Sequence, residues 1–238
     1  MKLNILAFAA HPDDVELAAG GTIIKHIKKG YKVGIADITK GELGTRGNAE
    51  TRFNETLEAN KILGLSIREN LELPDGFFNK NHDSLIKVIT CIRKYQPDIV
   101  LCNAIYDRHT DHGKAADLVA EAAFLSGLIK IETFENKNLQ EAWRPKNVYH
   151  YIQDRYIKPD FVVDISDYFE DKMNAIKAYK SQFYNPDSIE PQTPISGKDF
   201  MEFLNARAKE FGRAIGVKYG EGFTVKKPVG ISNLFDIF

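Results

Sequence analysis

The chain has 238 residues, of which 43% are hydrophobic and 27% charged, and its formal net charge is −1. A chain of this length can bury a sizeable core, and its balanced charge gives no reason to expect nucleic acid or an anionic membrane as a partner. We see no run of eighteen apolar residues and no charged-then-apolar leader, so we expect a cytoplasmic protein without a membrane span. Cys91 and Cys102 lie among apolar neighbours, and we expect both to be reduced, structural residues.

Strands and helices are expected to alternate through the first 130 residues. The expected strands are 3–9, 32–38, 71–73 and 98–103, and the expected helices are 16–29, 49–63, 84–95 and 113–125. The fourth strand is nearly all apolar, as strands buried on both faces of a parallel sheet are. This alternation predicts an α/β fold with a Rossmann-like, doubly wound, mostly parallel sheet and helices on both faces.

Beyond residue 130 the pattern is less regular. Strands are expected at 148–152 and 161–165, and helices at 167–180 and 199–215. We find no linker, and therefore predict one domain over residues 1–238. Residues 1–130 form its Rossmann-like half, and residues 131–238 complete the fold and supply substrate and oligomer contacts. The tail contains six apolar residues that we expect to cover a neighbouring subunit: Val229, Ile231, Leu234, Phe235, Ile237 and Phe238.

A polar turn, His11-Pro12-Asp13-Asp14, ends the first expected strand. Pro12 fixes its own φ and biases His11 toward an extended conformation, so the turn gathers one imidazole and two carboxylates in a small volume. The simpler interpretation is a polar loop whose aspartate caps the next helix, because Asp is a favourable N-cap residue. Taken alone, the turn leaves both interpretations open.

A second polar cluster, residues 106–113, follows the fourth strand and contains His109, Asp111 and His112. In the common strand order 3-2-1-4-5, strands 1 and 4 are neighbours, and their connections open a crevice at the carboxyl ends. This topology predicts that the two clusters meet. The other three histidines are isolated in the sequence, and we expect structural roles for them: His26, His82 and His150.

Two histidines and one carboxylate that converge with an open position are typical of a catalytic metal site, because a structural site would be closed by four protein ligands. Such a donor set suits Zn²⁺ and also describes the facial triad of a non-haem Fe(II) enzyme. Zinc needs no redox partner, and the water it binds is an effective nucleophile near neutral pH. Among the remaining groups, a carboxylate could act as base, a histidine as acid, and the aspartate between the histidines could orient an imidazole.

These motifs resemble the PIG-L/LmbE-like zinc-dependent N-deacetylases. The likeness rests on His-Pro-Asp-Asp at 11–14 and His-Thr-Asp-His at 109–112, with support from Gly-Glu-Leu-Gly-Thr at 41–45 and the helix segment 52–64. In addition, residues 218–223 and 226–235 look like the bacillithiol-biosynthesis N-acetylglucosaminyl-malate deacetylases. The resemblance therefore covers most of the chain.

The resemblance implies a zinc ion held by three ligands: His11, Asp14 and His112. It further implies that Asp13 is the base that activates the zinc-bound water. His109 would stabilise the oxyanion and protonate the leaving amine, with Asp111 behind it. Some relatives carry a tyrosine at the position that Asp107 occupies here, and Tyr106 is adjacent to it.

Three residues are expected to contact the substrate. Arg52 matches an arginine that binds substrate in the family, Arg108 belongs to the second polar cluster, and Glu42 lies in the glycine-containing loop. An arginine can hold a carboxylate through two parallel hydrogen bonds, which would fit an anionic malyl group. The simpler interpretation of Arg52 is a weak surface salt bridge with Glu55.

The sequence thus predicts a hydrolase that removes acetate from an N-acetylglucosamine derivative. By resemblance, N-acetylglucosaminyl malate of bacillithiol biosynthesis is the expected small-molecule substrate, and another conjugate or a chitooligosaccharide is the alternative. Zn²⁺ is the expected cofactor, although Fe²⁺ could replace it in the cell, and a non-haem Fe(II) enzyme would share the ligands. A Rossmann dinucleotide-binding protein would need Gly-x-Gly-x-x-Gly where this chain has His-Pro-Asp-Asp. The resemblance also implies a homo-oligomer, with a hexamer as its expected form.

Overall fold

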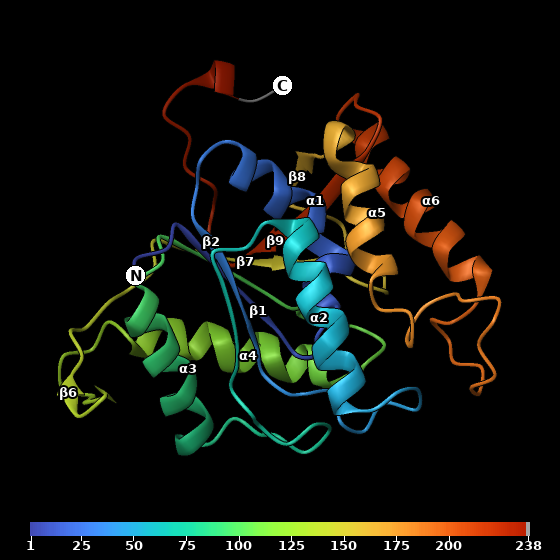
Figure 1. Ribbon diagram of the computed structural model, residues 1–238. Helices are drawn as coiled ribbons and strands as arrows, with labels where there is room; N and C mark the ends of the chain where they lie inside the picture. The colour runs from blue at the N-terminus through green and yellow to red at the C-terminus, as the bar shows by residue number, and fades with distance from the viewer. Residues whose placement is uncertain (237–238) are drawn as a thin grey trace.

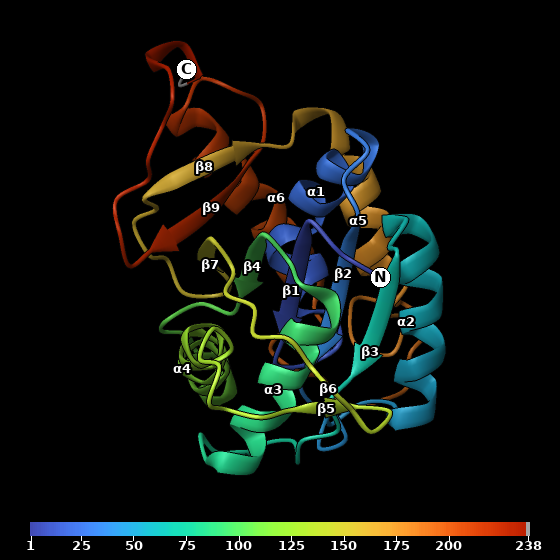
Figure 2. The same cartoon turned by 90° about the vertical axis from the view of Figure 1, so that its left-hand side faces the viewer.

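Seven strands form the central sheet: β1 (Ile5–Ala9), β2 (Val33–Asp37), β3 (Ile67–Asn70), β4 (Ile99–Cys102), β7 (Asn147–Tyr151), β8 (Phe161–Asp164) and β9 (Gly220–Val225). The computed structural model describes residues 1–236 and gives the strand order β3-β2-β1-β4-β7-β9-β8 (Figures 1 and 2). The first five strands of this order run parallel, whereas β9 pairs antiparallel with β7 and β8. The predicted mostly parallel α/β sheet, with strands 1 and 4 as neighbours, is confirmed. A separate two-stranded hairpin consists of β5 (Phe134–Glu135) and β6 (Asn138–Leu139).

Helices cover both faces of this sheet: α1 (Asp14–Lys28), α2 (Ala49–Leu63), α3 (His82–Tyr95), α4 (Thr110–Leu125), α5 (Phe169–Lys177) and α6 (Lys198–Ala214). Two short 3-10 helices are η1 (Ser166–Tyr168) and η2 (Leu234–Asp236). α3 and α4 pack together on one side, and α1, α2 and α5 lie on the other (Figure 1). In the described part of the chain, no helix is long and apolar enough to cross a membrane.

The buried sequence of β1 explains its central position. Side chains alternate between the two faces of a strand. Leu6 and Phe8 accordingly join the core beneath α3 and α4, whereas Ile5, Ala7 and Ala9 join the core beneath α1. All five are buried, so the turn that follows β1 is positioned by a rigid strand with packed helices on both sides.

The third strand lies at Ile67–Asn70, and the predicted strand at 71–73 is wrong. β3 is an edge strand whose polar residues have specific partners, so its sequence carries no apolar alternation. Arg68 donates to Asp37, and Glu69 accepts from Lys94 and Tyr95. A pattern based on burial of apolar side chains cannot reveal such a strand.

The C-terminal elements match their predictions unevenly. The strands β7 and β8 and the helix α6 lie within one residue of the predicted bounds, but α5 ends at Lys177 rather than at residue 180. β9 was not predicted, because glycine disfavours strands and this one contains Gly220 and Gly222. The glycines are needed for packing, since a Cβ on Gly222 would lie 3.0 Å from the ring of Phe211 in α6.

The C-terminal tail leaves its apolar side chains exposed. Val229 and Ile231 are 46% and 43% exposed, and Leu234 and Phe235 are 79% and 93% exposed. Ile237 and Phe238, which were also expected to cover a neighbouring subunit, lie outside the described residues. The oligomer contact stays a prediction. Cys91 and Cys102 are buried and free, which confirms their expected state.

Candidate active site

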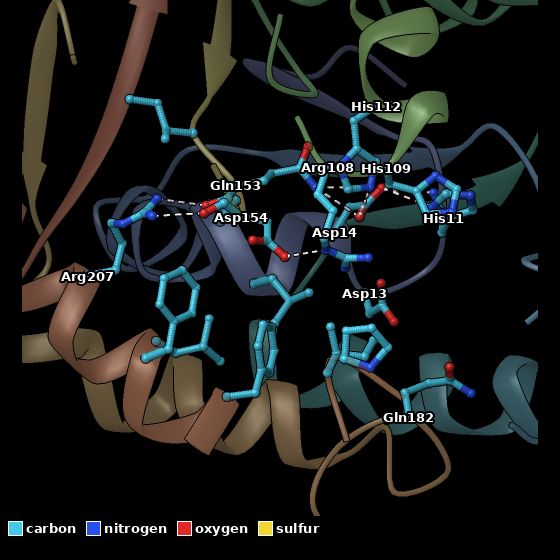
Figure 3. A pocket seen from close by; sticks show the side chains of 18 of the residues that line it. His11, Asp13, Asp14, Arg108, His109, His112, Gln153, Asp154, Gln182 and Arg207 are labelled. Atoms are coloured by element: carbon cyan, nitrogen blue, oxygen red, sulfur yellow. Dashed lines mark hydrogen bonds and ion pairs between the residues drawn. The ribbon is translucent and has the colours of Figure 1, made fainter. Parts of the chain in front are cut away.

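A cavity of about 360 Å³ contains side chains from both predicted polar clusters. β1 and β4 are hydrogen-bonded in parallel, with Ala7 opposite Leu101, so the loops that follow them leave the sheet side by side. Figure 3 shows His11, Asp13 and Asp14 from the first loop near His109 and His112 from the second. The prediction that topology brings the two clusters together is confirmed.

Three imidazoles converge at one end of the cavity. The ring centroids of His11 and His109 are 4.6 Å apart, and those of His109 and His112 are 5.3 Å apart. One ring nitrogen from each lies within 4.8 Å of the others, close enough to hold a metal ion. The Asp14 carboxylate lies between two of them, 3.7 Å from His11 Nδ1 and 3.1 Å from His112 Nε2. The three ligands implied by the family resemblance are therefore contiguous.

The electrostatics of this group favour a cation. Although burial disfavours a charged imidazole, the surrounding carboxylates raise the pKa of His11 to about 10 and that of His112 to about 9. Although burial opposes it, the His112 and His11 imidazoles hold the pKa of Asp14 well below its usual range. The site thus stabilises positive charge in a buried place, and His11, Asp14 and His112 fit a divalent ion by donor type and arrangement.

Asp107 orients His112, one of the three expected ligands. Its Oδ2 lies 2.5 Å from His112 Nδ1, and its Oδ1 accepts a hydrogen bond from the Arg155 amide, so His112 Nε2 faces Asp14. A carboxylate on the outer nitrogen of a ligand histidine fixes the tautomer and the ring orientation. Sequence reasoning noted Asp107 only as a departure from tyrosine. The adjacent Tyr106 is exposed, and its hydroxyl contacts the Arg155 side chain.

Two residues that the sequence did not single out hold Asp14. The Asn103 amide donates to Asp14 Oδ2 over 2.9 Å, and the Gln153 amide donates to Asp14 Oδ1 over 3.0 Å. Both are buried and bond each other over 3.0 Å. Only their position in the sequence could have indicated a role. Asn103 comes just after β4, and Gln153 comes shortly after β7.

Asp13 is held in an unusual backbone conformation. Its φ of 116° lies in the left-handed region, and its side chain makes no capping hydrogen bond to α1. The interpretation of this residue as a simple helix cap is therefore wrong. Burial raises the pKa of the Asp13 carboxyl to about 7, against the opposing influence of the Arg52 guanidinium. A carboxylate that titrates near neutral pH and lines the cavity is suited to act as a general base.

Arg52 lies in the cavity rather than in a surface ion pair. It is buried, and its guanidinium packs on Gly41, whose φ is 64°. A Cβ on Gly41 would stand 2.3 Å from Arg52 Nη1, so only glycine lets the loop lie this close. Glu55, the partner in the simpler interpretation, accepts instead from the amide and hydroxyl of Ser181. This position supports the expected substrate contact of Arg52.

Arg108 and Glu42 differ in position. Arg108 lines the cavity, and its Nε donates to Asp154 over 2.7 Å. Glu42 is exposed, and its carboxylate accepts from the backbone amides of Lys40 and Asp75. Glu42 is not among the residues that line the cavity. Substrate contact by these two residues stays a prediction.

His109 and Asp111 begin α4. His109 is exposed to the cavity, and burial together with the neighbouring His11 and His112 lowers its pKa. The Asp111 carboxylate accepts from the Gly76 amide and from Lys114, and lies 3.5 Å from His11 Nε2. The structure thus directs Asp111 to His11, and its expected support of His109 stays a prediction.

The wall opposite the imidazoles is apolar and comes mainly from α6 (Figure 3). Arg207 closes this wall, since its guanidinium donates to the backbone carbonyls of Gln153 and Asp154 over 2.8 Å each. The C-terminal part of the chain, residues 131–238, thereby contributes to the shape of the cavity. Five residues of α6 contribute apolar surface: Phe200, Phe203, Leu204, Ala208 and Phe211.

Comparisons with known proteins agree with this geometry. The PIG-L family model, described as GlcNAc-PI de-N-acetylase, matches residues 6–123. The chain is 30% identical to diacetylchitobiose deacetylase of Thermococcus kodakarensis over 233 residues, which cover 92% of this chain and 81% of that protein. The chain belongs to the PIG-L family. Its expected class, a hydrolytic N-deacetylase, is confirmed at this level.

Two other similar proteins extend the comparison. The crystal structure of the conserved protein TT1542 from Thermus thermophilus superposes with a TM-score of 0.87 and 33% identity, covering 98% of both chains. The 4-oxalmesaconate hydratase of Pseudomonas putida is 26% identical over 195 residues, or 75% of this chain and 74% of that protein. A chain similar to this one is therefore a hydratase, which any assay of this protein must consider.

Proposed function

We propose that this PIG-L family protein uses zinc to remove acetate from an N-acetylglucosamine conjugate. The observation that carries the proposal is the position of Asp13. Its carboxyl, with a pKa of about 7, adjoins the ligand set formed by His11, Asp14 and His112 in one cavity. A base that is half ionised at neutral pH, beside a cation site, is the arrangement that hydrolysis of an unactivated amide needs.

The residues divide the reaction between them. A bound zinc would polarise the acetamide carbonyl and lower the pKa of water. Asp13 removes the proton from the attacking water. His109 lies beside His11 and His112, and in its protonated form it donates a proton to the departing amine nitrogen as the carbon–nitrogen bond breaks. The products are acetate and a free amine. Asp13 then releases the proton it took from water and His109 regains one from solvent, so atoms and charge balance without another reactant.

For the substrate we propose N-acetylglucosaminyl malate. The C-terminal resemblance to deacetylases of bacillithiol biosynthesis supports this choice, as do Arg52 and Arg108, two of the arginines that line the cavity. Diacetylchitobiose is the second candidate, supported by the 30% identity to the diacetylchitobiose deacetylase. The two differ in charge, because only the malyl conjugate carries carboxylates for an arginine to bind.

Acetate release from a panel of compounds tests the proposal. The zinc-loaded protein is expected to deacetylate N-acetylglucosaminyl malate with a higher kcat/KM than diacetylchitobiose or free N-acetylglucosamine. Preference for diacetylchitobiose would replace the malyl substrate with the second candidate. Turnover of 4-oxalmesaconate without release of acetate from any member of the panel would contradict the proposed function.

The metal is tested separately from activity. Elemental analysis of protein purified without added metal is expected to find zinc, whereas iron would assign the Fe(II) alternative. Asp14→Ala is expected to lose most of the metal. Asp98→Ala serves as the control, because Asp98 pairs with Lys146 and does not line the cavity. Stoichiometric zinc at native affinity in Asp14→Ala would contradict the ligand assignment.

We also propose that the protein forms a homo-oligomer, with a hexamer as the expected form. The exposure of Leu234 and Phe235 in the tail supports contact with another subunit, because isolated large apolar side chains gain from burial. Light scattering of the intact chain and of the Leu234→Ser/Phe235→Ser variant measures the assembly. A monomer at micromolar concentration would contradict the proposal.

A further inference from the structure

Asp75 is a buried carboxylate in the cavity with no role so far. It lies between β3 and α3, in the loop that follows Leu73, and only 6% of its surface is exposed. Its Oδ1 lies 3.1 Å from Nε2 of the ligand His11. Asp75 therefore contacts a proposed metal ligand from the side that faces away from Asp14.

The contacts of His11 assign its two nitrogens. Nε2 faces two acceptors, Asp75 Oδ1 at 3.1 Å and Asp111 Oδ2 at 3.5 Å, so this nitrogen carries a proton and donates it. Nδ1 faces Asp14 at 3.7 Å. A neutral imidazole that donates from Nε2 presents its lone pair at Nδ1. The edge of His11 that remains for a cation is thus the edge beside Asp14.

The same carboxylate also holds a loop of the cavity. Asp75 Oδ2 accepts from the Leu43 amide over 2.9 Å, and the backbone amide of Asp75 donates to Glu42 over 3.0 Å. Gly41 and Leu43, in this loop, line the cavity, and Gly41 packs on the Arg52 guanidinium. One side chain therefore links the loop to His11.

We propose that Asp75 is a positioning residue that holds His11 with Nδ1 toward the cation and ties the loop 41–45 to the metal centre. Cation affinity and the order of this loop are then coupled. This inference rests on the proposed function. Asp75 supports His11 in the way that Asp107 supports His112, with one carboxylate on the outer nitrogen of each imidazole.

A different role for Asp75 makes opposite predictions. His11, Asp75 and Asp111 are close enough to hold a cation themselves. In that case His11 Nε2 would be a ligand and could not donate to Asp75, because one nitrogen cannot do both. If Asp75 were a ligand of the same ion, Asp75→Asn would remove a coordinating oxygen. If the three residues formed a separate site, the wild type would bind a second ion.

Cation affinity is the first test. Chelator competition with zinc, without substrate, is expected to show about 10–100-fold weaker binding in Asp75→Asn. Asp164→Asn is the control, since this acid bonds Ser166 and does not line the cavity. Cobalt at saturation is expected to give one ion per chain and the same visible absorption spectrum in wild type and Asp75→Asn. Wild-type affinity, a second ion, or an altered cobalt spectrum in Asp75→Asn would each overturn the proposal.

Hydrogen exchange of the loop is the second test. Zinc is expected to slow exchange of the amides in 41–45 in the wild type and to have little effect on them in Asp75→Asn. Glu42→Ala removes one bond between Asp75 and the loop and leaves the bonds of the Asp75 carboxylate to Leu43 and His11. It should speed exchange in the loop and, because the coupling is reciprocal, weaken zinc binding by less than Asp75→Asn does. Loop exchange that zinc leaves unchanged in the wild type would overturn the coupling. If the wild type binds no divalent ion, the proposed function fails instead.

Discussion

Two buried clusters of charge adjoin the helix α1, and they are built differently. The first is the group around His11 and His112 in the cavity. The second is centred on Arg68, whose guanidinium donates to both oxygens of Asp37 over 2.7 and 2.9 Å and to Glu16 over 2.5 Å. The Tyr179 hydroxyl donates to the same Glu16 over 2.9 Å. The charged side chains of both clusters are buried in the fold, but only the first cluster borders the cavity.

The difference lies in where the positive charge comes from. Arg68 is a permanent cation whose planar guanidinium matches a carboxylate. The chain itself therefore supplies the positive charge of the second cluster. In the first cluster, four aspartates contact two imidazoles that carry charge only while protonated. Among the described residues, the fixed cation Lys114 reaches only Asp111, and the other three carboxylates form ion pairs with the imidazoles alone. Beside a cavity, such a cluster can take up an exchangeable metal ion. Buried charge alone does not indicate such a site.

The largest expected effect comes from Asp13→Asn in the first cluster. Asn tolerates a left-handed backbone and keeps the shape of the side chain but cannot accept the proton. We expect kcat to fall by about 10²–10⁴ while zinc affinity and the unfolding midpoint stay near their wild-type values. Acetate-release kinetics with metal analysis measure both. Near-normal turnover would move the base elsewhere, and loss of zinc would mean that Asp13 is a ligand.

Arg68→Met is the matching change in the second cluster. It leaves Glu16 and Asp37 buried without their cation, and breaking a buried pair in this way costs about 3–5 kcal/mol of unfolding free energy. Urea unfolding followed by circular dichroism measures the loss. Lys61→Met, which removes an exposed partner of Glu58, should leave the midpoint unchanged. Equal midpoints for the two variants would show that the second cluster contributes nothing to stability.

A smaller effect is expected from Asp107→Asn. The amide can still approach His112 but no longer offers it a charged acceptor, so zinc affinity should fall by about 10–100-fold. Stability should change little, in contrast to Arg68→Met. Competition with a chelator gives the affinity, and an unchanged value would remove Asp107 from the support of the metal centre.

The smallest signal is a release of protons. Without a cation, the pKa values of about 10 for His11 and about 9 for His112 leave both imidazoles protonated at pH 7. Ligation needs neutral imidazoles, so zinc binding at pH 7 should release about two protons, and apparent affinity should rise with pH until both pKa values are passed. Calorimetry in buffers of different ionisation enthalpy counts these protons. Zero release would show that the imidazoles are already neutral.

The sequence predicted those parts of the site that depend on local motifs and sheet topology. His11, Asp14 and His112 could be brought together because their loops follow neighbouring strands. Asp75 and Gln153 could not be found in this way, since they reach the site from loops whose position depends on how β3 and β7 pack. Packing of side chains between distant segments leaves no periodic signal in a single sequence.

The fold shows the same division. β1, whose five residues are all buried, was predicted from its apolar run, whereas β3 and β9 were missed. β3 is polar because its side chains form ion pairs and hydrogen bonds, and β9 contains glycines because α6 lies close against it. In both strands the residue types are set by specific neighbours rather than by burial of apolar surface.

The left-handed backbone of Asp13 has a consequence for how this protein can change. A residue other than glycine at φ 116° carries conformational strain of order 1–3 kcal/mol. Asp13→Gly would relieve that strain and lose only about 0.4–1 kcal/mol to the greater freedom of glycine in the unfolded chain. Asp13→Gly is therefore expected to be the more stable protein. Because the same change removes the proposed base, the residue that favours stability at this position differs from the residue that favours turnover.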